Sequence, residues 1–125
     1  MGLFSALLGN AGAVNPNEFA KQYGILLIDG ERIELGFKLV RDTFIFTNKR
    51  LILIDKQGIT GNKTEYKSIV YKAITRFSVE TAGTFDLDAV LNIWISNETV
   101  PSIQKQFNKS VDVYQVQKIL AQHVL

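Results

Sequence analysis

Apolar and polar residues alternate with a period of two along much of this chain of 125 residues. The first such run places Ile33, Leu35, Phe37 and Leu39 at every second position. Successive side chains of a β-strand point to opposite faces, so this run predicts a strand with one buried face. Six further runs rich in strand-forming residues follow, separated by turn residues. They predict strands at 43–47, 50–55, 64–70, 76–81, 87–96 and 100–107.

Helix signals stand at both ends of this series of strands. Asn15, Pro16 and Glu18 fit the cap, first and third positions of a helix that ends near Gly30. Asp112 and Gln115 similarly fit the start of a terminal amphipathic helix. A further short helix is expected near the N-terminus, where four apolar residues form one stripe. The members of this N-terminal stripe are Leu3, Phe4, Leu7 and Leu8.

The order of elements predicts a mainly β fold with α-helices in a single domain. Seven meandering antiparallel strands of this length must curl into a barrel or pack as two sheets. A lone amphipathic helix can then close the open end. We expect a barrel of seven strands capped by the C-terminal helix and preceded by one or two short helices. Residues 1–30 are expected to form a helical extension and residues 31–125 the domain itself.

Two stretches of the sequence resemble the bacterial pleckstrin-homology (PH) domain family. They are Gly36–Gly58 (GFKLVRDTFIFTNKRLILIDKQG) and Arg76–Asp88 (RFSVETAGTFDLD). The resemblance extends over roughly Gly30 to Leu125. It implies a PH-like barrel of seven strands capped by a helix, a tendency to form ring-like homo-oligomers, and no established enzymatic activity.

One departure from eukaryotic PH domains bears on ligand binding. Domains of that kind that bind inositol phosphates use basic residues along a long loop between the first two strands. Here that connection is Arg41-Asp42-Thr43, nearly a minimal turn. Lys38 and Arg41 offer charge, but no loop can wrap a headgroup, so phosphoinositide recognition is not expected.

The composition argues against catalysis. The chain has no Cys and a single His, which removes most nucleophile–base pairs and most zinc sites. His123 falls in the last turn of the predicted terminal helix, where it complements the helix dipole. No cofactor and no enzymatic activity are therefore predicted.

Three carboxylates surround a predicted turn at residues 82–84. They belong to Glu80, Asp86 and Asp88, and hard cations bind such groups. The spacing matches no calcium loop, so solvated turn residues are the favoured interpretation and no metal is predicted. The same three residues, with Lys49 and Arg50, are candidates for binding a polar partner. For Arg50 the alternative is a structural ion pair at the turn.

Apolar residues also occupy the outward positions of several strands. In the strand at 87–96, Val90 and Trp94 point away from the presumed core face. The strands at 43–47 and 50–55 carry large apolar residues on both faces. A small barrel fills its interior from one face only, so these groups need cover from the N-terminal helices or from another subunit. Val90, Trp94 and the N-terminal stripe are thus candidate contacts for self-assembly.

Charge is distributed unevenly along the chain. Residues 49–76 hold seven cations and two anions, whereas residues 80–104 hold four anions and no cation. One sheet is therefore expected to be basic and the other acidic, which favours head-to-tail contacts between subunits. The basic half lacks a recognition helix, so nucleic acid is not an expected partner.

The sequence thus predicts a non-catalytic binding or scaffolding domain that assembles with itself and that could also bind another protein or peptide. The alternative is a membrane-surface adaptor, which would bind anionic lipid through the basic residues at 49–76 and the N-terminal stripe. The apolar start lacks a basic region and is too short to span a bilayer, so a cytoplasmic location is expected.

Overall fold

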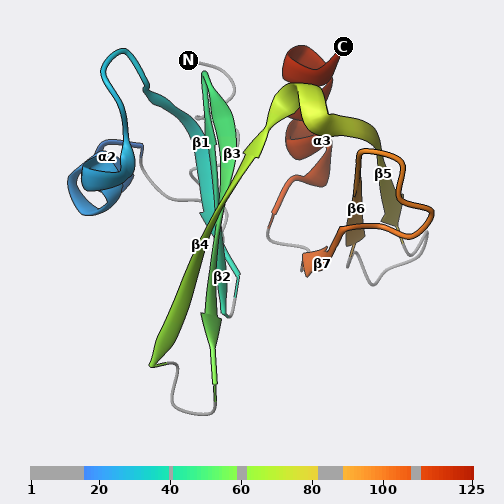
Figure 1. Cartoon of the computed structure of the whole chain (residues 1–125), viewed down its shortest axis with the longest axis horizontal. Helices are drawn as coiled ribbons and strands as arrows, with labels where there is room; N and C mark the ends of the chain where they lie inside the picture. Colours follow the sequence, from blue (N-terminus) through green and yellow to red (C-terminus); the bar gives the residue numbers. More distant parts are fainter. Residues whose placement is uncertain (1–15, 40, 59–61, 82–88, 108–110) are drawn as a thin grey trace. The chain divides into compact units, whose positions relative to one another are not determined.

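The computed structural model contains two compact units, residues 1–70 and residues 71–125, and each is considered by itself (Figure 1). It describes residues 16–39, 41–58, 62–81, 89–107 and 111–125. The N-terminal stripe, Asp86 and Asp88 lie outside these ranges, so the roles predicted for them stay predictions.

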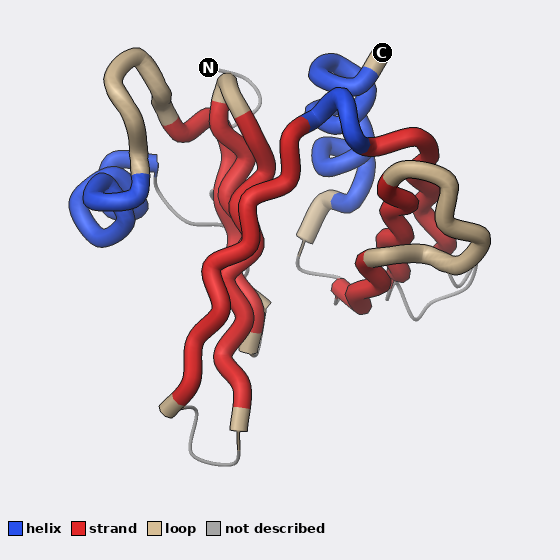
Figure 2. Tube along the Cα trace, viewed as in Figure 1, coloured by secondary structure: helices blue, strands red, loops and turns tan. Residues whose placement is uncertain are grey.

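The first unit holds a four-stranded antiparallel meander with the strand order β1-β2-β3-β4. Its strands are β1 (Ile33–Lys38), β2 (Asp42–Thr47), β3 (Arg50–Gln57) and β4 (Lys63–Val70). Figure 2 shows the antiparallel meander, in which a tight turn joins β2 to β3. The four strands predicted in this part of the sequence are confirmed, within two residues at each end.

Both faces of this sheet bury apolar side chains. On one face, Phe37 stacks on Phe44 with ring centroids 5.1 Å apart. On the other face, Ile45, Ile52 and Ile54 form a buried cluster with Phe19. Phe19 comes from helix α2 (Pro16–Tyr23), so this chain's own N-terminal helix covers that face. The sequence left open whether a helix or a second subunit does so.

The first helix is shorter than its apolar spacing predicts. Pro16 begins it, as the sequence indicates, but the α-helical geometry ends at Tyr23. A 3-10 turn, η1 (Gly24–Leu26), follows, and Leu26 and Leu27 pack against the Phe19 cluster from there. Gly24 destabilises a helix interior relative to alanine, which accounts for the early end.

Gly36 gives Phe19 the room it needs. A Cβ built on Gly36 would overlap the fully buried Phe19 ring. We predict that Gly36→Val destabilises the fold by about 1–3 kcal/mol, because the ring must leave its packed position. Urea denaturation measures this cost. In a Phe19→Ala background the same substitution should cost much less, and an equal cost in both backgrounds would contradict the packing described.

The second unit holds a three-stranded antiparallel sheet and the terminal helix. The sheet has the order β5-β6-β7. Its strands are β5 (Ile74–Thr81), β6 (Ala89–Ile95) and β7 (Ile103–Phe107). The helix α3 (Val113–Val124) packs against β5 and buries Val116, Ile119 and Leu120. As predicted, Asp112 caps it, and its carboxylate accepts the Tyr114 N–H at 3.1 Å.

A closed barrel is wrong for the described part of the chain. Its seven strands form two separate sheets, and β4 and β5 are edge strands of different sheets. A closed barrel would require β4 to pair with β5. Instead, the 3-10 turn η2 (Tyr71–Ala73) separates these two strands in the sequence. A period of two fixes which residues are strands but not which strands pair, so it did not distinguish the two arrangements.

Within the described strands, the predicted separation of charge between the sheets is not found. The strands of the four-stranded sheet and those of the three-stranded sheet each carry a formal charge of +1. Arg76 and Lys105 lie on β5 and β7, where they outnumber Glu80. Among these strands, charge segregated along the sequence does not become segregation between sheets, while Asp86 and Asp88 lie outside the described residues.

Candidate functional site

A candidate contact surface surrounds Trp94 on β6. An open depression of about 450 Å³ lies beside it. Its lining residues are Thr75, Arg76, Trp94, Ser96, Asn97, Glu98 and Thr99. The side chain of Trp94 is partly exposed, on the outward face that the alternation in β6 predicts. We call this surface the Trp94 depression.

Cross-strand pairing places a cation over the indole. Arg76 on β5 lies opposite Trp94, and its guanidinium carbon is 4.1 Å from the indole ring centroid. This distance is within the range of a cation–π interaction. The indole N–H points to the Thr99 carbonyl, with 3.4 Å between nitrogen and oxygen. The indole is therefore held in place while part of it remains accessible.

The loop that forms the rest of the Trp94 depression is fixed by side-chain hydrogen bonds. The hydroxyl of Thr75 donates to the Ser96 carbonyl at 2.7 Å. The hydroxyl of Ser102 donates to Glu98 at 3.0 Å and accepts the Ile95 N–H at 3.2 Å. Ser96 has a φ of 57°, in the left-handed region, and so turns the chain sharply after β6.

A polar ladder crosses the centre of the same sheet face. Asn92 is 3% exposed, and its amide donates to Glu80 at 2.8 Å and to Ser78 at 3.2 Å. The side chain of Gln104 on β7 donates to the Asn92 oxygen at 2.7 Å. The strand alternation did not single out Asn92, although a polar residue between the apolar Val90 and Trp94 on one strand face could have indicated it. Val90 is partly buried opposite Glu80, which the ladder already engages.

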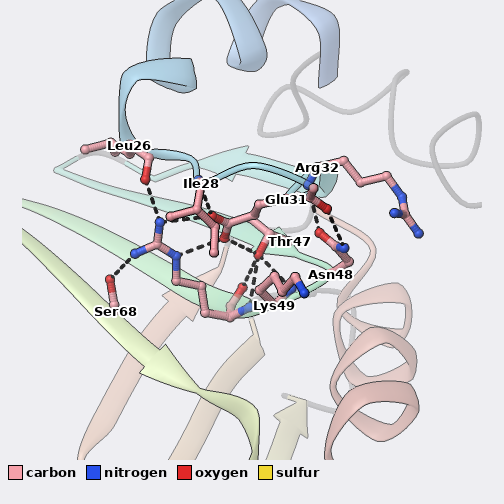
Figure 3. Close-up of polar contacts among 10 residues, drawn as sticks. Leu26, Ile28, Glu31, Arg32, Thr47, Asn48, Lys49 and Ser68 are labelled. Atoms are coloured by element: carbon pink, nitrogen blue, oxygen red, sulfur yellow. Dashed lines mark hydrogen bonds and ion pairs between the residues drawn. The ribbon is translucent and has the colours of Figure 1, made fainter.

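Arg50 and Glu31 form an ion pair in the first unit, in which the Glu31 side chain is fully buried and the Arg50 side chain is 23% exposed (Figure 3). The Arg50 Nε and Nη2 donate to the two oxygens of Glu31 at 2.9 and 3.0 Å. Nη2 also donates to the Leu26 carbonyl at 2.6 Å, and Nη1 to the Ser68 hydroxyl at 2.7 Å. The structural ion pair that the sequence offered for Arg50 is therefore present. Its partner Glu31 was not foreseen, because no periodicity marks a residue just before a strand.

The Glu31 carboxylate accepts four hydrogen bonds in all. The Thr47 hydroxyl donates at 2.7 Å and the Ile28 N–H at 3.1 Å, in addition to the two from Arg50. Burial alone would raise the pKa of Glu31. The hydrogen bonds from Arg50, Thr47 and Ile28, with the charge of Arg50, outweigh burial and lower the pKa from 4.5 to about 2. Glu31 is thus ionised and serves to hold the η1 segment onto the sheet.

The β2–β3 turn completes this connection. The side chain of Asn48 accepts the Arg32 N–H at 2.7 Å and donates to the Gly30 carbonyl at 3.0 Å (Figure 3). The Lys49 N–H donates to the Thr47 hydroxyl at 3.0 Å, while the Lys49 side chain is exposed. Arg50 and Lys49 thus adjoin each other in a structural turn, and a partner role for either stays a prediction.

Two further observations concern metal ions and membranes. Among the described residues, no group of three or more His, Asp or Glu residues is arranged to hold a metal ion. In the same residues, no helix is long and apolar enough to cross a membrane. The membrane-surface alternative depends on the N-terminal stripe and stays a prediction.

An antiparallel meander of four strands, a sheet of three strands and a C-terminal helix define a PH-like domain. The family model for the bacterial PH domain matches residues 2–124. This chain therefore belongs to the bacterial PH domain family, as its resemblance indicated.

Relatives cover nearly the whole chain. The uncharacterized protein YjqA of Bacillus subtilis (strain 168) is 54% identical over 121 residues, which is 97% of each chain. The crystal structure of a DUF1696 family protein with a PH domain from Shewanella loihica PV-4 is 52% identical, with a TM-score of 0.82. The match covers 94% of this chain and 99% of that one. A PH domain from Shewanella amazonensis SB2B is 50% identical over 99% of both chains, with a TM-score of 0.79.

Proposed function

We propose that this protein is a non-catalytic binding domain that assembles with copies of itself through the Trp94 depression. The observation that carries the proposal is a partly exposed tryptophan with an arginine over its ring, beside an open hollow of about 450 Å³. Tryptophan and arginine are the residues most enriched at the energetic centres of protein interfaces.

The geometry supports a protein partner rather than a small molecule. The hollow is open to solvent, and polar loop residues surround a single aromatic side chain. A small-molecule pocket is instead enclosed and lined mainly by apolar groups. A rim of polar groups around an aromatic centre is typical of protein interfaces. A second copy is the partner that the resemblance to ring-forming PH domains favours, and Val90 and the N-terminal stripe are further candidate contacts.

Trp94→Ala is the direct test of this contact. We expect wild-type protein at high micromolar concentration to have a mass several times 14.0 kDa, measured by light scattering coupled to size exclusion. The variant should shift toward the monomer, because truncating a central interface tryptophan costs about 2 kcal/mol or more of binding. Tyr114→Ala is the matched control, since Tyr114 is 59% exposed on α3 and lies outside the depression.

Two outcomes would count against the proposal in different ways. A wild-type monomer at all concentrations would overturn self-assembly. An oligomer that Trp94→Ala and Tyr114→Ala leave equally intact would keep self-assembly but remove the Trp94 depression as its contact.

A further inference from the structure

A second, smaller pocket lies in the first unit, where the end of α2 meets the sheet. It has a volume of about 100 Å³. Its polar lining residues are Gln22, Tyr23, Lys38, Arg41, Thr43 and Lys56. Each of these six side chains can donate hydrogen bonds. We call it the basic pocket.

The register of the sheet brings these donors to one face. Lys38 pairs with Thr43, and Thr43 pairs with Ile54. Lys56 follows Ile54 by two residues and so points to the same side of β3. Ile54 belongs to the cluster that Phe19 covers, so this is the face on which α2 lies.

The helix contributes its last turn to the pocket. The ring of Tyr23 packs edge-on against Phe19, with centroids 5.4 Å apart. This contact holds Tyr23 beside the sheet, next to Gln22. The pocket is therefore made jointly by the sheet and by the N-terminal helix.

Positive charge in the pocket is not balanced by its lining. Lys38, Arg41 and Lys56 are lining residues, and no described lining residue is acidic. The carboxylates of the neighbouring strand ends belong to Asp42 and Asp55, which pair with each other at positions that alternate to the opposite face. Glu31 pairs with Arg50 and Glu65 with Lys67, so neither of these two ion pairs involves the pocket.

Two backbone contacts hold the third cation in place. The Arg41 Nη2 donates to the Gly58 carbonyl at 2.8 Å, and the Lys56 N–H donates to the Arg41 carbonyl at 3.1 Å. The backbones of Arg41 and Lys56 are thus joined, and the exposed side chains of both residues line the same pocket. Like charges held together raise the free energy of the fold, and a bound anion offsets that cost.

We propose that the basic pocket binds a single phosphate group, either as inorganic phosphate or as a phosphate monoester. A tetrahedral dianion offers acceptors to several donors at once, and such charge-assisted hydrogen bonds are the strong ones. The pocket is small, about 100 Å³, and partly open to solvent. It therefore suits one phosphate group better than an inositol polyphosphate, in agreement with the short β1–β2 connection.

The experiment is calorimetric titration of the full-length protein with inorganic phosphate and with glycerol 3-phosphate at constant ionic strength. We expect saturable binding that Lys38→Gln/Lys56→Gln weakens by at least about tenfold, because each lost partner is charged. The control, Lys72→Gln/Lys118→Gln, removes the same charge from exposed positions of the second unit and should bind as the wild type does.

A third arm separates soluble phosphate from a lipid headgroup. It measures flotation of the protein with phosphatidylcholine vesicles that contain phosphatidic acid. The proposal is supported if the pocket variant loses binding and the control variant keeps it. The probe that binds then identifies the phosphate source as soluble phosphate or a lipid headgroup. No saturable binding to any of the three probes, or equal loss in pocket and control variants, overturns it. The Trp94 depression is unchanged in these variants, so this result is independent of self-assembly.

Discussion

Replacing Arg50 by methionine should destabilise the fold by about 3–5 kcal/mol, the usual cost of removing one partner from a buried ion pair. The Glu31 side chain is fully buried, and Arg50 donates to both of its oxygens. The substitution leaves a buried carboxylate without its cation, and it also removes the donors to Leu26 and Ser68. Urea denaturation at pH 7 measures the loss.

The pH dependence of stability distinguishes this mechanism from a loss of packing. In the wild type, the pKa of Glu31 falls from 4.5 in the unfolded chain to about 2 in the fold. This depressed pKa stabilises the fold fully above pH 4.5, and the contribution is lost as the pH falls from 4.5 toward 2. The difference corresponds to about 3 kcal/mol.

In Arg50→Met, the dependence of folding stability on pH should reverse in mild acid, so that stability rises as the pH falls. A buried carboxylate without its cation has a raised pKa, so protonation relieves the destabilisation as the pH falls from 7 toward 4. The double variant Glu31→Gln/Arg50→Met removes both charges and should recover part of the loss at pH 7. Equal stability of the single and double variants at pH 7 would contradict the buried-charge explanation.

Truncation of Phe19 to alanine should cost about 3–5 kcal/mol, as for other fully buried aromatic side chains. Its ring is 0% exposed and packs with Ile45, Ile52 and Ile54 of the sheet. The variant loses this contact and leaves a cavity that Gly36, without a side chain, cannot fill. Urea denaturation measures this cost, from both the midpoint of the unfolding transition and the dependence of the unfolding free energy on urea concentration.

The matched control for Phe19 lies on the following turn. Ile25 is an apolar residue that is 93% exposed, so Ile25→Ala should change stability by no more than about 0.5 kcal/mol. A cost below about 1 kcal/mol for Phe19→Ala would mean that α2 does not stabilise the sheet. Loss of the helical signal without a change in midpoint would mean that α2 detaches independently of the sheet.

The sequence was most informative about features that depend only on neighbouring residues, such as strands and helix caps. The alternation in Ile33–Lys38 and in Ala89–Ile95 identified both strands correctly. It was wrong about the face of Ile33, because a bulge between Ile33 and Leu35 turns Ile33 toward the Phe19 cluster. The Asp112 cap and the Pro16 start were also readable, because capping involves residues within one helical turn. Trp94 was recognised as an outward residue for the same reason.

The polar sites were harder to predict from the sequence, because the residues that form each site are far apart along the chain. Glu31 and Arg50 are nineteen positions apart, and no spacing rule links them. Asn92 joins Glu80 and Gln104, each twelve positions away, only after three strands have paired. The basic pocket likewise needs the end of α2 beside β1 and β3, which no charge count of the sequence indicates.

Read alone, the 125 residues established seven strands, the helix starts near Pro16 and Asp112, and the family. They left undecided how the strands divide into sheets, which element covers Ile45 and Ile52, and what neutralises Arg50. Side-chain periodicity reports on one element at a time, since it arises from the geometry of a single strand or helix. Strand pairing, the seating of Phe19 on Gly36 and the burial of Glu31 depend on contacts between distant segments, and those exist only once the chain has folded.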